Sequence, residues 1–374
     1  MRWLKVRFQL AQPDLPAWEE LEPSWREVVE SGRLTAGAQV ASLEAAVARS
    51  CGVAHCVAVA NCTLGLQMAM GLFAPGEVIL PAFAFVATAQ SVAWARHRPV
   101  FVDCDPSTFT VSPEEVAAAV TAETRAICAV NVFGVPPDMD ALREVGRRAG
   151  VPVVVDSAQG LGSRWGGVPV GGLGTIEVFS LSPAKVVTGA EGGLLTTDDA
   201  ALAARLRAMG DYGRLPDGEV PTALGTNGRM SELHAALAGA CLGRLEAHVA
   251  HRRRLAEVYR RSLEDVQGLR WQVEGPRAWS NATFFVIVVE SEVRRAQLGA
   301  WLEARGIETR RYFWPALHRH PSFGLWGGRT SGSLERTEAL SAGGLALPLH
   351  RGLSEADCEE IAEAVREGLR LSGA

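Results

Sequence analysis

The chain has 374 residues, which is enough for one large domain and one smaller one. Its formal net charge of −5 argues against a nucleic-acid partner, because no broad basic surface is available to neutralise phosphates. No window approaches the ~18 apolar residues of a membrane span, and the start lacks the apolar core of a signal peptide. The seven cysteines form no C-x-x-C pair, so we expect reduced thiols in a soluble cytoplasmic protein without a metal site.

Strands and helices are predicted to alternate over the first half of the chain. The first residues give helices from Trp18 and over 42–50. Buried strands follow at 56–60, 77–81, 98–103, 126–131 and 152–156, and helices at 64–72, 84–95, 113–120 and 138–149. The strands are continuously apolar, so each should be covered on both faces in a mostly parallel sheet.

Three polar positions fall where predicted strands end, at the edge where such sheets bind ligands. They are the turn at 61–63, Asp156 and Ser180. The turn at 61–63 precedes a helix, whose first backbone N–H groups favour an anion. A plain N-cap by Asn61 or Thr63 explains the same residues equally well.

A single lysine, Lys185, lies between a strand ending at Ser180 and a glycine-rich turn at 189–193. Among apolar neighbours an ammonium loses hydration, so its pKa falls and the neutral amine becomes a nucleophile towards a carbonyl. This is the chemistry of a Schiff base. The alternative is a loop lysine whose charged head lies in water.

The second half of the chain changes in composition. A helix over 199–209, a loop over 212–228 and two further helices precede a strand at 284–289, helices at 293–305 and 354–369, and an aromatic, basic loop at 310–321. We expect a boundary near residue 248, with a large domain at 1–248 and a small domain at 249–374.

Together these positions fit pyridoxal 5′-phosphate. A carboxylate such as Asp156 would keep its ring nitrogen protonated. Thr63, the helix start at Leu64, and Ser180 offer donors to a phosphate, and Phe85 could stack on the ring. Each also has a simpler interpretation: Asp156 as a turn former, Ser180 as a local cap and Phe85 as core filling.

Over nearly its full length the sequence resembles the sugar aminotransferases of the DegT/DnrJ/EryC1/StrS family, which are fold-type-I pyridoxal-phosphate enzymes. The resemblance rests on six stretches in the family's order: 61–66 (NCTLGL), 81–88 (PAFAFVAT), 156–159 (DSAQ), 179–185 (FSLSPAK), 191–193 (EGG) and 225–230 (GTNGRM). It implies an α/β fold, in which a large domain with a mostly parallel central sheet flanked by helices is followed by a smaller C-terminal α+β domain.

The resemblance also implies roles for individual residues. Lys185 matches the lysine that binds the cofactor covalently, Asp156 the partner of the ring nitrogen, Gln159 the residue beside the phenolic oxygen, and Phe85 the stacking aromatic. Thr63 and Ser180, with the helix start at Leu64, match the phosphate site. The candidates for substrate contacts are Arg229 and, in a loop at 311–318, Arg311, Tyr312 and His318.

Asn227 matches a residue that family members place in the neighbouring subunit's phosphate site, which implies a homodimer with shared active sites. The alternative for Asn227 is that it caps the following helix within its own chain.

The sequence departs from the family's pattern at Cys62, Tyr212 and Ala190, where glycine, histidine and glycine are usual. A branch that removes a hydroxyl group has histidine at the lysine position, so Lys185 indicates a transaminase. The expected reaction moves an amino group from glutamate or glutamine to the 3- or 4-keto group of a nucleotide-linked deoxysugar. The alternatives are a keto-cyclitol acceptor, or a regulatory protein that binds the cofactor without turnover.

Overall fold

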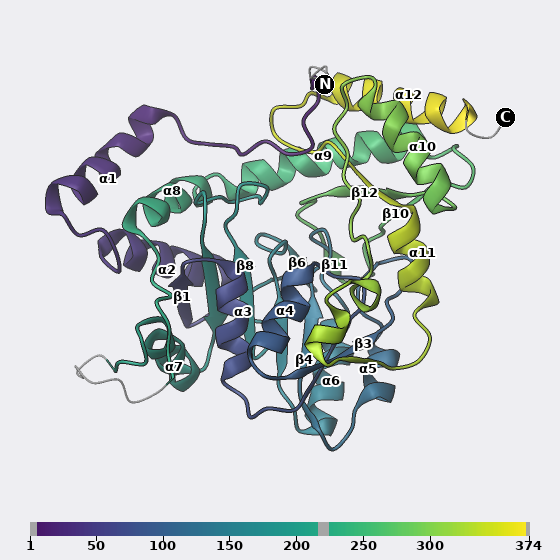
Figure 1. The fold of residues 1–374 in the computed structure, drawn as a ribbon. Coiled ribbons are helices and arrows are strands. Elements are labelled where there is room, and N and C mark those ends of the chain that lie inside the picture. Colours follow the sequence, from purple (N-terminus) through teal and green to yellow (C-terminus); the bar gives the residue numbers. More distant parts are fainter. Residues whose placement is uncertain (1–5, 216–223, 372–374) are drawn as a thin grey trace.

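The computed structural model describes residues 6–215 and 224–371. The middle of the predicted loop at 212–228 and the first five residues lie outside this part. An eight-stranded sheet forms the centre of the molecule (Figure 1). Its strands, in spatial order, are β1 (His55–Val59), β9 (Gly193–Thr197), β8 (Ile176–Ser180), β5 (Val153–Asp156), β4 (Thr124–Val130), β2 (Glu77–Pro81), β3 (Arg98–Val102) and β13 (Arg329–Thr330).

The sheet is mostly parallel, as predicted. All pairings from β8 to β13 are parallel, and only β9 runs antiparallel to its two neighbours, β1 and β8. Because β9 opposes both neighbours, β1 runs in the same direction as β8. The carboxyl ends of β1, β8, β5, β4, β2 and β3 therefore meet at one edge.

Helices cover both faces of the sheet. Successive side chains of a buried strand point to opposite faces, so they belong to two different apolar cores. In β2, Val78 and Leu80 belong to one core and Ile79 to the other. The first core is completed by α3 (Cys62–Gly71), α4 (Val86–Trp94) and α7 (Ala200–Gly210). The second is completed by α1 (Trp18–Ser31), α2 (Ala38–Cys51), α5 (Pro113–Ala119), α6 (Met139–Ala149) and α8 (Glu232–Leu242).

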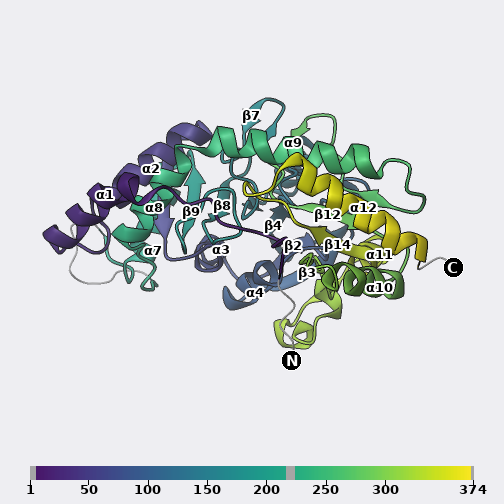
Figure 2. The same cartoon turned by 90° about the horizontal axis from the view of Figure 1, so that it is seen from above.

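The C-terminal part is α+β, which confirms the prediction. An antiparallel sheet of β10 (Arg270–Trp271), β12 (Phe285–Val288) and β14 (Gly344–Leu347) packs with α10 (Glu292–Glu303), α11 (Glu335–Gly343) and α12 (Glu355–Leu371). Figure 2 shows β12, β14 and these helices from above. A third sheet joins β6 (Arg164–Trp165), β7 (Val168–Pro169) and β11 (Ala278–Trp279). Of two short 3-10 helices, η1 (Leu317–Arg319) lies in the predicted aromatic loop at 310–321, and η2 (Phe323–Trp326) follows just after it.

The boundary at residue 248 stays a prediction. Helix α9 (Leu245–Leu263) runs without interruption through that position, and Phe8 pairs with Ile307 of the C-terminal part. Within residues 6–215 and 224–371, none of the helices combines the length and apolar character that crossing a bilayer requires.

The largest error at a helix end concerns α2, which begins four residues before the predicted start at 42. The carboxylate of Glu232 accepts hydrogen bonds from the backbone N–H groups of Gly37 (2.8 Å), Gln39 (2.8 Å) and Val40 (3.0 Å). A side chain almost 200 positions away thus caps this helix, so no local pattern could reveal its start.

Candidate active site

Lys185 lies in the loop between β8 and β9, at the edge where the parallel strands end. The side chain is half-buried, and burial lowers the pKa of its ammonium, while the charges of Cys62 and Asp156 act in the opposite direction. Its ammonium has no hydrogen bond or ion pair with any described residue. This environment differs from that of the solvated loop lysine considered above, and it favours a nucleophilic amine.

Asp156 ends β5 beside this loop, and only 4% of its surface is exposed. Its carboxylate accepts hydrogen bonds from Thr88 Oγ1 (2.6 Å) and from the backbone N–H of Ala158 (3.1 Å). Burial raises the pKa of Asp156, and the bonds from Thr88 and Ala158, with the charge of Lys185, oppose that rise. The two hydrogen bonds therefore hold the carboxylate in place, close enough to Lys185 for the charges of the two groups to interact.

Thr88 is a residue to which the sequence assigned no role. It lies on α4, within one of the six matching stretches. The residues around a threonine in a helix do not indicate that its hydroxyl reaches Asp156 at the end of β5. The Thr88 hydroxyl donates to the Asp156 carboxylate, so it stabilises the ionised form and fixes one oxygen.

Thr88→Val is expected to raise the pKa of Asp156 further, because the variant loses a hydrogen bond to the charged form while burial stays the same. Activity on the acidic side of the pH profile should then disappear at a higher pH than in the wild type. The measurement is kcat/KM against pH, with Thr88→Ser as the control that keeps the hydroxyl. Superimposable profiles for Thr88→Val and the wild type would show that Thr88 does not influence the ionisation of Asp156.

The turn after β1 is where the sequence predicts an anion. Asn61 is the N-cap of α3 and accepts the backbone N–H of Leu64 at 2.9 Å, which confirms the capping interpretation. Thr63 lies in the first turn of α3, where N–H groups have no partner within the helix. The Leu64 N–H is thus already bonded, and Thr63 is the better placed donor for a phosphate.

β9 passes directly behind this turn, next to the end of β8. Gly193 pairs with Ser180 across the two strands, and a Cβ atom at Gly193 would lie 2.6 Å from the backbone carbon of Asn61. Only glycine permits this approach. The contact brings Ser180 and the start of α3 together, as the sequence predicts.

Phe85 is 53% exposed at the start of α4, so it does not fill the core. Its ring lies 6.5 Å from that of Phe313. Gln159, by contrast, is buried: its side-chain oxygen accepts the N–H of Phe133 at 2.6 Å, and its backbone carbonyl accepts from Asn281 and Thr283, each at 2.9 Å. The C-terminal part therefore fixes Gln159, while Phe85 remains open to a ligand.

Asn227 does not cap the following helix. The N-cap of α8 is Ser231, whose hydroxyl accepts the N–H of Leu233, and Asn227 is exposed and pairs through its backbone with Asp211. Arg229 forms an ion pair with Asp211 at 2.8 Å and lies over the ring of Tyr212. The alternative role of Asn227 as a helix cap is wrong.

The loop at 311–318 lies beside the end of β2, since the N–H of Leu317 donates to Ala82 O at 3.0 Å. The guanidinium of Arg311 lies 4.0 Å from the ring centre of Trp314, and Tyr312 packs against Phe284. His318 Nε2 lies 2.9 Å from Glu338 Oε1. The structure thus brings this loop to the site, with His318 bonded to α11.

A buried polar chain behind Asp156 also escaped the sequence analysis. Asn131 Nδ2 donates to Ser157 Oγ (2.8 Å), which donates to Glu177 Oε2 (2.6 Å). Burial raises the pKa of Glu177, and hydrogen bonds from Ser157 and from backbone N–H groups oppose that rise. The signal in the sequence was a lone carboxylate inside the apolar strand β8.

The chain is similar to known proteins over most of its length. The model of the DegT/DnrJ/EryC1/StrS aminotransferase family matches residues 18–366. The GDP-perosamine synthase of Caulobacter vibrioides is 34% identical over 89% of this chain and 91% of its own length. A pleiotropic regulatory protein of Geobacillus stearothermophilus is 33% identical over 94% of this chain and 96% of its own. The crystal structure of DesI with its TDP-sugar product superimposes with a TM-score of 0.91 at 33% identity, covering 99% of this chain and 96% of the other.

Proposed function

Because the chain belongs to the DegT/DnrJ/EryC1/StrS aminotransferase family, we propose that it uses pyridoxal 5′-phosphate to move an amino group from glutamate or glutamine to a keto group of a nucleotide-linked sugar. The observation that carries this proposal is the position of a half-buried Lys185, its pKa lowered by burial, beside the buried carboxylate of Asp156. The relatives named for GDP-perosamine and for a TDP-sugar support the acceptor class.

The residues at the sheet edge fit this cofactor in chemistry and in space. The first turn of α3, with Thr63, and Ser180 provide hydrogen-bond donors for a phosphate. Asp156 provides an anion for a protonated ring nitrogen, and the exposed ring of Phe85 provides a flat apolar face. Gly193 leaves the space in which β9 and the α3 turn meet.

When bound, the cofactor supplies a carbonyl for amine exchange and a ring that withdraws electrons. The amine of Lys185 would take a proton from the donor's α-carbon and return it to the cofactor carbon that carries the transferred amine, which requires the neutral form that burial favours. Asp156, fixed by Thr88, would keep the ring nitrogen protonated. Gln159 cannot swing away, since both its side chain and its carbonyl are bonded.

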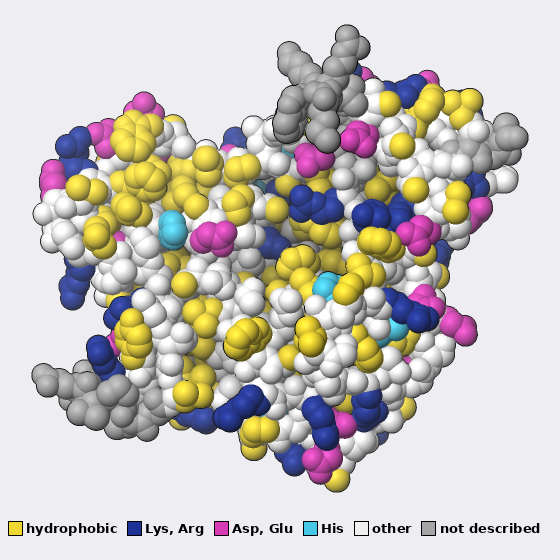
Figure 3. Space-filling view, viewed as in Figure 1, with side chains coloured by type: hydrophobic (Ala, Val, Ile, Leu, Met, Phe, Trp, Pro, Cys, Tyr) yellow, Lys and Arg dark blue, Asp and Glu magenta, His cyan; other side chains and the backbone are white. Residues whose placement is uncertain are grey.

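The acting form is a homodimer in this proposal, with Asn227 of each chain reaching the phosphate site of the other. Trp18 (56% exposed) and Val29 (65%) lie on α1, and Figure 3 shows hydrophobic side chains gathered over α1 and α8. An exposed apolar surface of this kind favours association. Asn227 is exposed and, as shown above, does not cap α8.

All seven cysteines are free, in keeping with a reducing cytoplasm.

Mixing inactive Lys185→Ala chains with inactive Asn227→Ala chains is expected to restore activity, because some mixed dimers contain one site with both residues intact. Activity is measured after conditions shown to exchange subunits. The matched control mixes Lys185→Ala with Asp156→Asn, whose residues belong to the same chain's site, and no recovery is expected. Full activity of Asn227→Ala alone, or failure of the first mixture, would refute the shared site.

The substrate assignment is tested with a panel of acceptors. Purified protein with cofactor and glutamate or glutamine is offered GDP- and TDP-linked 3- and 4-keto-deoxysugars and keto-cyclitols, and amine transfer is followed by mass spectrometry. Transfer to a nucleotide-linked sugar is expected. Transfer only to a cyclitol would show that the acceptor is a keto-cyclitol and not a nucleotide-linked sugar. Bound cofactor whose absorbance is unchanged by either donor would indicate a regulatory protein.

A further inference from the structure

The loop at 311–319 is bonded at two places to one helix, α11. Ser341 Oγ donates to the backbone carbonyl of Phe313 at 2.6 Å. Glu338 Oε1 lies 2.9 Å from His318 Nε2 and accepts from Arg319 Nε and Nη2 at 2.9 and 2.7 Å. Both ends of the loop are therefore bonded to the same helix, one turn apart.

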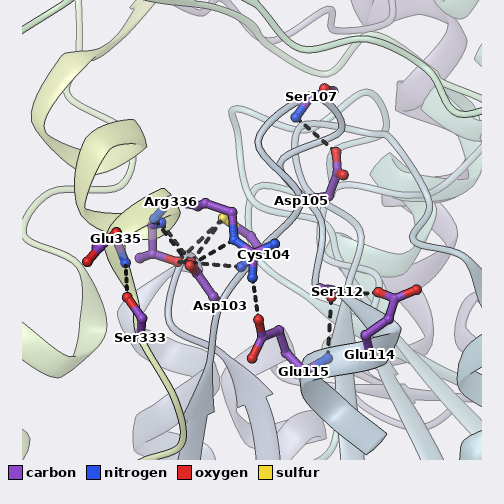
Figure 4. Close-up of polar contacts among 11 residues, drawn as sticks. Asp103, Cys104, Asp105, Ser107, Ser112, Glu114, Glu115, Ser333, Glu335 and Arg336 are labelled. Carbon is purple, nitrogen blue, oxygen red and sulfur yellow. Dashed lines mark hydrogen bonds and ion pairs between the residues drawn. The ribbon is translucent and has the colours of Figure 1, made fainter. Parts of the chain in front are cut away.

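The helix is in turn fixed to the edge of the central sheet by Asp103, which directly follows β3 (Figure 4). The residue at the N-cap of α11 is Leu334, which has no side-chain hydrogen bond to offer. Asp103 takes its place: the carboxylate accepts the N–H of Arg336 (3.1 Å) and of Thr337 (2.8 Å), the hydroxyl of Thr337 (2.7 Å) and Nε of Arg336 (3.0 Å). A capping residue from a distant strand thus holds the first turn of α11.

Asp103 performs this role as an ionised group. It is 2% exposed, and burial by itself would raise its pKa, but the hydrogen bonds from Thr337 and Arg336 outweigh burial and hold the pKa below its usual value. The guanidinium of Arg336 also binds Glu115 on α5. The negative charge faces the positive end of the α11 dipole, which strengthens the attachment.

We propose that Asp103 and Glu338 are positioning residues for the acceptor substrate: Asp103 fixes α11 to the sheet edge, and Glu338 fixes the loop at 311–319 beside the site. His318 then anchors the loop, in place of the substrate contact predicted for it, and leaves Arg311 and Tyr312 to face the acceptor. The inference rests on the proposed function, in which donor and acceptor react in separate steps. In the described part of the chain, neither Asp103 nor Glu338 bonds to Lys185 or Asp156, so the donor step should not depend on them.

The test compares Glu338→Ala with Glu335→Ala, a matched change on the exposed side of the same helix. Hydrogen–deuterium exchange of the cofactor-free chains reports on the loop. Faster exchange at 311–319 is expected only in Glu338→Ala. With the acceptor that has the highest kcat/KM in the panel, KM should rise about tenfold, on the order of the loss of a charge-assisted hydrogen bond. The rate at which glutamate changes the cofactor absorbance should match the wild type.

Wild-type exchange together with a wild-type KM in Glu338→Ala would overturn the inference. So would an equal loss in the donor step, because that result indicates a general structural role. Asp103→Asn, paired with Asp105→Asn as control, tests the attachment of α11; among the described residues, the side chain of Asp105 bonds within its own turn, to Ser107 and Thr108. A wild type without any donor response would overturn the proposed function, and the exchange comparison would still decide whether Glu338 holds the loop.

Discussion

Lys185→Ala is expected to lose at least about 10³-fold in kcat, because the side chain both holds the cofactor and moves the proton, and a positioned acid–base group alone contributes roughly 10²–10⁴-fold. Burial lowers the pKa of the Lys185 ammonium, which favours the neutral amine that both tasks need. Donor turnover is measured as formation of the 2-oxo acid from glutamate at saturating cofactor.

The chain offers a well-matched control, since it contains only one other lysine, Lys5. Lys5→Arg should keep wild-type turnover, and circular dichroism should show that Lys185→Ala remains folded. Turnover of Lys185→Ala within tenfold of the wild type would remove Lys185 from the chemistry.

Asp156→Asn is expected to bind the cofactor but to lose on the order of 10²–10³-fold in kcat, the range found when a key electrostatic partner is deleted. An amide at this position cannot stabilise a positive ring nitrogen as the buried carboxylate does. The variant keeps the shape of the side chain, so packing around β5 should change little. Turnover and cofactor absorbance are measured on the same preparation.

Asp138→Asn is the control for this change. Asp138 caps α6 through a hydrogen bond from Ala141 N–H and, among the described residues, bonds to neither Lys185 nor Asp156; asparagine is an equally good cap. Both stability and turnover should therefore stay near those of the wild type. Near-normal turnover in Asp156→Asn would show that the ring nitrogen needs no anionic partner here.

The central sheet was predictable because its strands are continuous apolar segments separated by turn residues, so β2 and β5 fall at or within one residue of their expected bounds. The short strands β6, β7, β11 and β13 could not be predicted, because a two-residue strand has no periodicity. The pairing of β13 with β3 comes from tertiary contacts, such as the ion pair of Arg329 with Glu77 (2.8 Å).

Some residues of the candidate site could be predicted from the sequence, and others could not. Lys185, Asp156, Ser180 and Thr63 could be proposed from the sequence, since Asp156 and Ser180 end strands, Thr63 begins a helix and Lys185 follows in the loop after β8. Thr88, Glu177 and Asp103 could not, because each acts through a hydrogen bond to an element distant in the chain. Local sequence carries no record of these partners.

The most direct test of the account is the covalent attachment of the cofactor. The protein is incubated with pyridoxal 5′-phosphate, reduced with borohydride and digested, and the peptides are mapped by mass spectrometry. With two lysines in the chain, the outcome is unambiguous. We predict a pyridoxyl group on the peptide that contains Lys185 and none on the peptide that contains Lys5. Cofactor bound without any adduct at Lys185, or with the adduct at Lys5 or the amino terminus, would contradict it.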